Sequence, residues 1–257
     1  MNQRPLILIS NDDGYEAKGL QALVDVAKEF GEVVVVVPDG PRSASSHAIT
    51  MSIPLRIKLY RTDEDGTRYY RSNGMPSDCV KLGLKVILKD RKADLIVTGI
   101  NHGSNSSASV LYSGTMGAAM EGSVENFPAI GFSLLDYAPN ADFSAAQVYV
   151  RKIIGKVLAN KIPDFTALNV NIPKAPLEEI KGVRITRQAL GYWHEELIER
   201  TDPYGGKYYW LSGWLENDDL AEDTCEWALQ HNYVSIQPVH HDLTAHQHIK
   251  EIKFLEE

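Results

Sequence analysis

The chain has 257 residues, of which 44% are hydrophobic, which is enough for a large buried core. Its formal net charge of −8, with no dense Lys/Arg tract, argues against a protein that binds a nucleic acid polymer through its phosphates. No apolar run approaches the roughly 20 residues of a membrane span, the N-terminus lacks the pattern of a signal peptide, and Cys79 and Cys225 share no metal-binding spacing. We therefore expect a cytoplasmic protein with two buried, reduced thiols that does not bind membranes.

The first half of the chain alternates strand-like and helix-like segments. Residues 6–10 and the five valines of 33–37 predict buried strands, with a helical pattern from about Glu16 to Phe30 between them. Polar and apolar residues alternate over 49–72, which predicts a hairpin or β extension. Ser77 is placed to cap a helix that reaches about Lys89. Later strands are expected at 94–100, 129–133 and 168–172, and later helices at 113–126 and 143–160. Such alternation implies βαβ units, so the expected class is α/β, a Rossmann-like three-layer αβα core with a mostly parallel sheet.

The character of the sequence changes after about residue 181. A strand at 185–188 and a long hairpin over 195–211 are expected, followed by a helix at 222–230 and a strand at 233–238. The tail from Leu243 has apolar residues at 243, 249, 252 and 255, which favours an amphipathic helix that docks on a partner subunit. We expect one domain over residues 1–257, with a core of about 1–180 and a β-hairpin-rich C-terminal extension for oligomerisation, with the tail, over about 181–257.

Two adjacent carboxylates follow the first predicted strand, in the segment Asn11-Asp12-Asp13-Gly14. Neighbouring carboxylates at the end of a buried strand repel each other unless a cation joins them, and a divalent cation with oxygen ligands would do so. The alternative is a solvated turn, because Asn, Asp and Gly are also favourable turn residues.

Two further loops also follow predicted strands, residues 39–47 and 99–105. In an open α/β sheet all three loops meet at the carboxyl edge, where ligands bind. They carry short Asp, Ser and Asn side chains, so that two carboxylates and neutral oxygens would balance the charge of one Mg²⁺ or Mn²⁺. A neutral site of this kind can accept a phosphate dianion.

The segment 112–122 places Ser113 and Thr115 before a run of small residues. This pattern predicts a helix N-terminus that could bind phosphate, and the alternative is simple capping of that helix. No dinucleotide-binding or P-loop motif is present. His47 and His102 lie beside the expected site and could donate a proton to a leaving group, although each is more simply explained by a local hydrogen bond.

Several segments in this order resemble the SurE (stationary-phase survival protein) family of 5′/3′-nucleotidases: 11–14, the Ser43 loop, 94–105, 112–119, and the supporting segments 76–80, 168–173 and 233–236. The resemblance runs from residue 5 to about 240. It implies a phosphomonoesterase that contains one divalent cation per subunit, acts on nucleoside monophosphates, and forms a homodimer or homotetramer with exchanged C-terminal elements. It further implies a nucleotide phosphatase of the acid type.

The resemblance also implies roles for individual residues. The metal ligands would be Asp12, Asp13, Ser43 and Asn101, of which the two aspartates are also catalytic. The phosphate site would be lined by Asn11, Asn105, Ser113, Gly114 and Thr115. The chain departs from the usual family pattern at Ser107 and Ser109, where Gly and Asp are usual, and at Met75, where Thr is usual. It departs again at Cys225 and Gln237, where Asp and Thr are usual.

The expected reaction is hydrolysis of nucleoside 5′- and 3′-monophosphates by a metal-activated water, with Asp12 as a proton acceptor. An alternative is a non-enzymatic module, either a receiver-like domain that binds Mg²⁺ or a nucleotide-sensing oligomer. Receiver domains need an acidic residue at the end of a later central strand, and here that segment is Thr98-Gly99-Ile100-Asn101. The sequence therefore favours the phosphatase.

Overall fold

A computed structural model describes residues 4–256 and contains a nine-stranded sheet. The strands lie in the order β3 (Ile57–Thr62), β4 (Arg68–Ser72), β2 (Glu32–Pro38), β1 (Leu6–Ser10), β5 (Leu95–His102), β6 (Ala129–Leu134), β7 (Thr166–Ile172), β11 (Val234–His240) and β8 (Val183–Ile185). The strands from β4 to β7 in this order are parallel, β3 and β11 run antiparallel to their neighbours β4 and β7, and β8 is parallel to β11. The sheet is mixed and mostly parallel.

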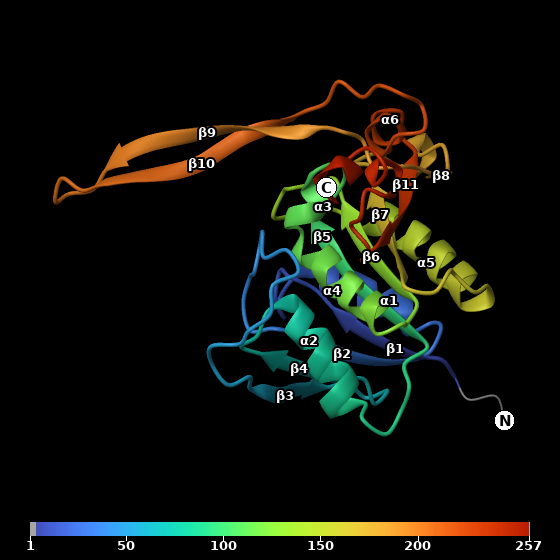
Figure 1. Cartoon of the computed structure of the whole chain (residues 1–257). Coiled ribbons are helices and arrows are strands. Elements are labelled where there is room, and N and C mark those ends of the chain that lie inside the picture. Colours follow the sequence, from blue (N-terminus) through green and yellow to red (C-terminus); the bar gives the residue numbers. More distant parts are fainter. Residues whose placement is uncertain (1–3, 257) are drawn as a thin grey trace.

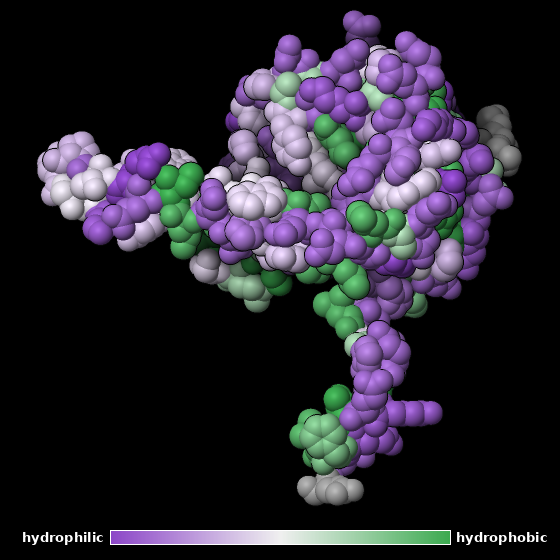
Figure 2. Space-filling view, turned by 90° about the horizontal axis from the view of Figure 1, so that it is seen from above, coloured by the Kyte–Doolittle hydropathy of each residue, from purple (hydrophilic) through white to green (hydrophobic). Residues whose placement is uncertain are grey.

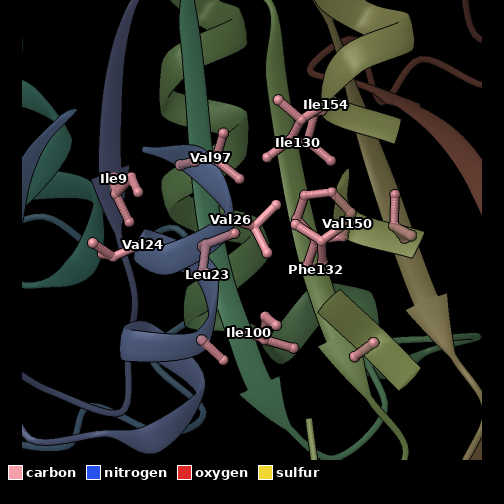
Figure 3. Close-up of a cluster of buried hydrophobic side chains, with 14 of the residues drawn as sticks. Ile9, Leu23, Val24, Val26, Val97, Ile100, Ile130, Phe132, Val150 and Ile154 are labelled. Carbon is pink, nitrogen blue, oxygen red and sulfur yellow. The ribbon is translucent and has the colours of Figure 1, made fainter. Parts of the chain in front are cut away.

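Helices cover both faces of this sheet (Figure 1). On one face α1 (Lys18–Ala27) and α5 (Ser144–Ala159) pack on side chains such as Ile9, Val97 and Phe132, which Figure 3 shows. On the other face α2 (Pro76–Leu82) and α4 (Gly114–Val124) pack on Leu8 and Ile96. Because successive strand residues point to opposite faces, strands that are buried on both sides are apolar throughout. The expected α/β class, with three layers, is confirmed.

The order of the strands creates a crevice at the carboxyl edge of the sheet. β1 and β5 are neighbours, but the chain leaves β1 through α1 toward β2 and leaves β5 through α3 (Ser109–Tyr112) and α4 toward β6. The two connections therefore diverge to opposite faces. Ligands of open α/β sheets bind at such a switch point.

One helix is shorter than expected. Ser77 does not cap it, because Pro76 occupies its first turn and Met75 precedes it. Proline is favoured there since the first helical N–H groups have no intrahelical partner. The α-helix ends at Leu82, and a π-helical turn over Gly83–Ile87 follows in place of a helix to Lys89.

Two other expectations hold only in part or are wrong. The hairpin expected within residues 49–72 is confirmed as the antiparallel pair β3 and β4, but residues 49–56 form no strand, and Ile49, Met51 and Ile53 are exposed there. The tail forms only the short 3₁₀ turns His246–His248 and Lys253–Glu256 in place of an amphipathic helix. Its apolar side chains are exposed, and a short helix without a packing surface is marginal in water.

One part of the extension after residue 181 adds strands to the sheet, and another part projects away from it. β8, α6 (Cys225–Gln230) and β11 pack at the end of the sheet, so the body of the fold continues past residue 181. In contrast, β9 (Tyr192–Thr201) and β10 (Lys207–Glu216) pair with each other and project far from the body as an arm (Figures 1 and 2). Within residues 4–256, none of the helices is long and apolar enough to cross a membrane.

Candidate active site

A cavity of about 570 Å³ lies at the switch point of the sheet. The predicted ligands Asp12, Asp13, Ser43 and Asn101 all line it, together with Asn105, Ser113 and His102. The structure thus brings the ends of β1 and β5, the loop after β2 and the start of α4 to one cavity. The other predicted site residues do not line the cavity. Asn11, Gly114 and Thr115 lie within two residues of the lining residues Asp12 and Ser113 in the chain, and His47 lies in the loop that carries Ser43.

Asp12 connects three of these elements. Its carboxylate accepts a hydrogen bond from the Thr115 hydroxyl at the start of α4. Its main-chain oxygen accepts one from the N–H of Arg42 at 2.7 Å, which holds the Ser43 loop against the end of β1. A side chain at Gly114 would place its Cβ 2.8 Å from the Cβ of Asp12, so only glycine lets the helix approach this closely.

Burial is the largest influence on the pKa values of the two carboxyl groups. Asp12 is only 5% exposed, and burial raises its pKa to about 6, against the opposing effect of the hydrogen bond from Thr115. The neighbouring charge of Asp13 raises it further. Burial also raises the pKa of Asp13, and His102 acts in the opposite direction. The protein alone therefore destabilises the charged forms that a cation would stabilise.

Some oxygen atoms of the proposed ligands have no hydrogen-bond partner among the described residues, and such atoms are free to coordinate a hard cation. The buried Oδ2 of Asp13 has no partner. The Asn101 amide donates to the carbonyl of Gly103 at 3.0 Å, which leaves its amide oxygen for another contact. Over residues 4–256, no three or more His, Cys, Asp or Glu side chains gather as a metal cluster. A mixed set of carboxylate, hydroxyl and amide oxygens suits Mg²⁺ or Mn²⁺ better than zinc.

His47 supports the loop that carries Ser43. Its Nε2 atom lies 2.9 Å from the Glu121 carboxylate on α4, and Lys81 on α2 contacts the same carboxylate at 2.6 Å. The neighbouring Ser46 donates through its hydroxyl to the Leu111 carbonyl at 2.7 Å. The structure therefore places this predicted proton donor in a hydrogen bond outside the cavity, whereas His102 lies inside it.

The predicted phosphate-site residues have several local contacts. The Ser113 hydroxyl accepts from the N–H of Met116 at 3.0 Å, so it does cap α4, as the alternative interpretation has it. The Asn105 amide donates to the Ser133 hydroxyl at 2.8 Å, and its N–H donates to Asn171 at 2.8 Å. The Asn11 amide donates to the Gly14 carbonyl at 2.9 Å and holds the turn that presents the two aspartates.

Sequence reasoning missed one side of the cavity. Tyr137 comes from the loop after β6, and Trp193, Glu195, Leu211, Ser212 and Gly213 come from the root of the hairpin arm. No motif in these segments signals a site, and the hairpin lies almost a hundred residues from the ligand loops in the chain. Only the three-dimensional arrangement places it at the cavity.

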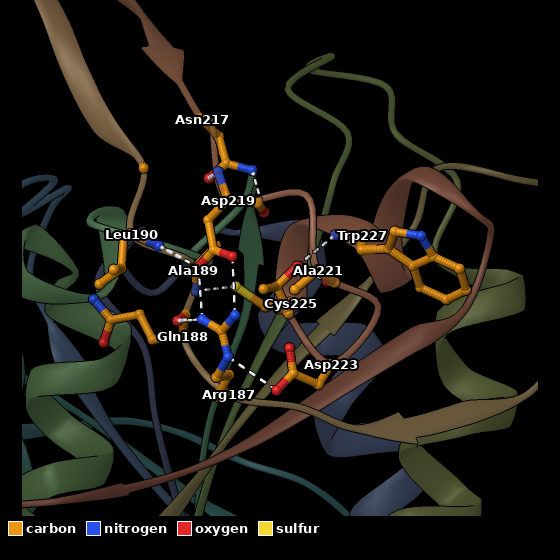
Figure 4. Close-up of polar contacts among 12 residues, drawn as sticks. Arg187, Gln188, Ala189, Leu190, Asn217, Asp219, Ala221, Asp223, Cys225 and Trp227 are labelled. Carbon is orange, nitrogen blue, oxygen red and sulfur yellow. Dashed lines mark hydrogen bonds and ion pairs between the residues drawn. The ribbon is translucent and has the colours of Figure 1, made fainter.

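Polar contacts fix the root of the arm to the body (Figure 4). The Arg187 guanidinium contacts Asp219 at 2.9 Å and Asp223 at 3.0 Å. The buried Cys225 thiol accepts the N–H groups of Ala189 at 3.3 Å and Ser107 at 3.4 Å. Ser107 lies in the loop that also carries Asn105, so these contacts join the arm to the site.

The comparison with family models decides the identity of the fold. A model described as Survival protein SurE matches residues 7–195, well over half of the chain. The chain belongs to the SurE family. This SurE chain is 50% identical over 251 residues to the 5′-nucleotidase SurE of Flavobacterium johnsoniae, which covers 98% of the chain and 96% of the relative.

Other members of the SurE family match over nearly their full length. The 5′-nucleotidase SurE of Cytophaga hutchinsonii is 52% identical, over 95% of this chain and 94% of the relative. The crystal structure of the SurE protein from Aquifex aeolicus superposes with a TM-score of 0.85 at 40% identity, over 98% of this chain and 100% of that one. The family resemblance inferred from the motifs is confirmed.

Proposed function

We propose that this SurE protein is a divalent-metal-dependent phosphomonoesterase that hydrolyses nucleoside 5′- and 3′-monophosphates to nucleoside and phosphate. The observation that carries the proposal is the convergence of Asp12, Asp13, Ser43 and Asn101 on one cavity, from the loops after β1 and β2 and from the end of β5. The names of the relatives support the 5′-nucleotidase activity. The 3′ activity and the metal dependence rest on the chemistry of the site and on the family resemblance.

The four converging residues would hold one Mg²⁺ or Mn²⁺ through oxygen atoms. When bound, such a cation would polarise the phosphoryl oxygens and lower the pKa of a water molecule. We assign the role of proton acceptor to Asp12, because its buried carboxylate lines the cavity in which the water would be held. The Thr115 hydroxyl orients that carboxylate by donating to one of its oxygens.

The remaining residues bind the phosphate and the leaving group. Ser113 lines the cavity at the first turn of α4, where the helix offers N–H groups and the positive end of its dipole to a phosphate. Asn105 lies close by in a buried network of amides that fixes its position. His102 lines the same cavity, and Phe143 packs edge-on against its ring at 4.9 Å, so it is held where it could protonate the leaving oxygen.

A substrate panel tests this function. Purified protein is assayed for phosphate release from nucleoside 5′- and 3′-monophosphates with Mg²⁺, with Mn²⁺ and with EDTA. Release from both classes with a cation, and its loss in EDTA, are expected. Full activity in EDTA would remove the cation from the mechanism, and failure on every nucleotide would overturn the function. The pH profile of the same assay tests the acid type of phosphatase that the resemblance implies.

The proposal includes assembly into a homodimer or homotetramer through residues 181–257. The arm carries large exposed apolar side chains, among them Leu197 and Trp210. An isolated two-stranded hairpin is marginally stable in water, and an exposed apolar surface of this kind usually contacts a partner. A second copy of the chain would bury it.

A further inference from the structure

We propose that the Tyr137 ring is the platform on which the nucleobase of the substrate stacks. This inference rests on the proposed function and deepens it, because it assigns the part of the cavity that recognises the nucleoside. Stacking on this ring would distinguish nucleotides from phosphate esters that lack a base.

The cavity is larger than the chemistry at the carboxylates requires. Its volume of about 570 Å³ lies within the range of about 300–1,000 Å³ in which proteins bind whole small molecules. Besides the four proposed cation ligands and Ser113, the lining includes aromatic and aliphatic side chains, Tyr112, Tyr137, Trp193 and Leu211. A phosphate bound at the carboxylates would leave room for the organic group attached to it.

Tyr137 lies next to the reacting end of the cavity. A Cβ at Gly103 would fall 2.2 Å from its ring, so the ring rests directly on the backbone of that glycine. Its hydroxyl accepts a hydrogen bond from the N–H of Ser104 at 3.2 Å. Gly103 is two residues after the proposed ligand Asn101, so the ring packs on the segment that directly follows that ligand. Gly103 also has a φ of 106°, a conformation that side chains other than glycine rarely adopt.

The ring is held in place yet exposed. The Asp136 carboxylate accepts from the N–H of Ala138 at 3.0 Å and from Lys174 at 3.0 Å, so the backbone is fixed on both sides of Tyr137. The side chain of Tyr137 is nevertheless 70% exposed while it lines the cavity. With one part of the ring seated on Gly103, the exposed remainder is available to a flat partner. A platform that is already ordered loses little entropy when the partner binds.

The chemistry that suits this surface is a nucleobase. Stacking of a base on an aromatic side chain is favourable for every base because each has a π-face, and its removal costs about tenfold or more in affinity. A sugar phosphate without a base would reach the same cation and phosphate groups but would gain nothing from the ring. The preference for nucleotides is therefore expected to depend on Tyr137.

The test compares two substrates, adenosine 5′-monophosphate and ribose 5-phosphate, on the wild-type protein and on Tyr137→Ala and Tyr137→Phe. The ratio of their kcat/KM values is expected to fall about tenfold in Tyr137→Ala, mainly through a higher KM for the nucleotide. Tyr137→Phe, which keeps the ring and loses the hydroxyl, is expected to retain the ratio. Phe165→Ala, at a 42% exposed aromatic residue of the body that does not line the cavity, is the matched control. Thermal melting verifies that each variant folds.

The outcomes separate this proposal from the proposed function. If Tyr137→Ala lowers the kcat/KM of both substrates in proportion, or if Tyr137→Phe loses the ratio as fully as Tyr137→Ala, the ring supports the Asn101 loop and the stacking proposal is wrong. If wild-type protein hydrolyses neither substrate, the proposed function itself is wrong.

Discussion

The Asp12 carboxylate lies buried where the end of β1, the Ser43 loop and the first turn of α4 meet. Burial favours the neutral, protonated form of this carboxyl group, whereas the ionised form needs a cation or several hydrogen-bond donors beside it. The contacts from Thr115 and Arg42 fix its geometry, and only the former reaches the carboxylate. The residue is thus arranged for a ligand that supplies positive charge.

This arrangement predicts how stability depends on pH in the absence of a cation. The pKa of Asp12 is about 6 in the folded protein and ordinarily 3.8, so the folded state holds this proton more tightly than the unfolded chain does. The stabilisation is full below about pH 4 and is lost as pH rises through about 6, a change of about 3 kcal/mol, since one pKa unit corresponds to about 1.4 kcal/mol.

Urea unfolding in EDTA between pH 4 and pH 8 measures this dependence. Asp12→Asn cannot ionise at that position. As pH rises, the unfolding free energy of the wild type is therefore expected to fall relative to that of Asp12→Asn. Addition of Mn²⁺ is expected to reverse the trend, because a cation binds the ionised carboxylate. Parallel pH curves for the two proteins would contradict the assigned burial effect.

At the level of the elements, three of the five positions at which we expect the chain to depart from the usual family pattern, Ser107, Ser109 and Cys225, lie near the root of the arm. Ser107, where the resemblance leads us to expect glycine, adopts a positive φ of 51°. Its hydroxyl donates to the Ala189 carbonyl at 3.0 Å and lies 3.2 Å from that of Gly191, and its N–H donates to Cys225, another departure. Ser109, a third, accepts from the Trp193 indole at 3.2 Å. These residues join the site loop to the root of the arm.

Ser107→Ala is expected to destabilise the protein by about 1–3 kcal/mol, because it leaves buried carbonyls without their donor. Alanine tolerates the positive φ no better than serine does, so the change isolates the hydroxyl. Ser123→Ala is the matched control, since its equally buried hydroxyl bonds only the Met120 carbonyl of the same helix. Urea unfolding compares the two variants, and an equal loss in both would show that the Ser107 contacts add nothing specific.

Much of the fold follows from local pattern. Buried strands such as β1 and β2 are almost entirely apolar and polar loops follow them, so their order and the convergence of Asp12, Ser43 and Asn101 are predictable. The helix after Met75 and the tail after Leu243 were not predictable, because their ends depend on what they pack against. Tyr137 and the hairpin root were missed for the same reason, since their role depends on contacts between distant segments.

On the scale of the whole molecule, the arm formed by β9 and β10 projects from the body (Figure 2) and exposes several large apolar side chains. Its cross-strand pairs include Ile198 with Trp210, and much of both strands lies open to solvent. Its root lines the cavity while its far part extends away from the body. Assembly through the arm would therefore couple the shape of the site to the oligomeric state.

Light scattering after size exclusion tests this assembly. Wild type is expected at a multiple of the 28.6 kDa chain mass, and the double variant Leu197→Glu/Trp210→Glu at a lower mass, because charges replace side chains that a second copy would bury. Val86→Glu, at an exposed valine on the body, is the control for the charge itself. A monomeric wild type, or a double variant of unchanged mass, would contradict the role of the arm.

The central claim is that one divalent cation binds between Asp12, Asp13, Ser43 and Asn101. Calorimetric titration with Mn²⁺ at pH 7.5 tests it most directly, on wild-type protein and on Asp12→Asn, with thermal melting to verify that both are folded. One bound Mn²⁺ per chain in the wild type, and its loss or severe weakening in the variant, is the predicted result. No binding by the wild type, or equal binding by the folded variant, would contradict the account.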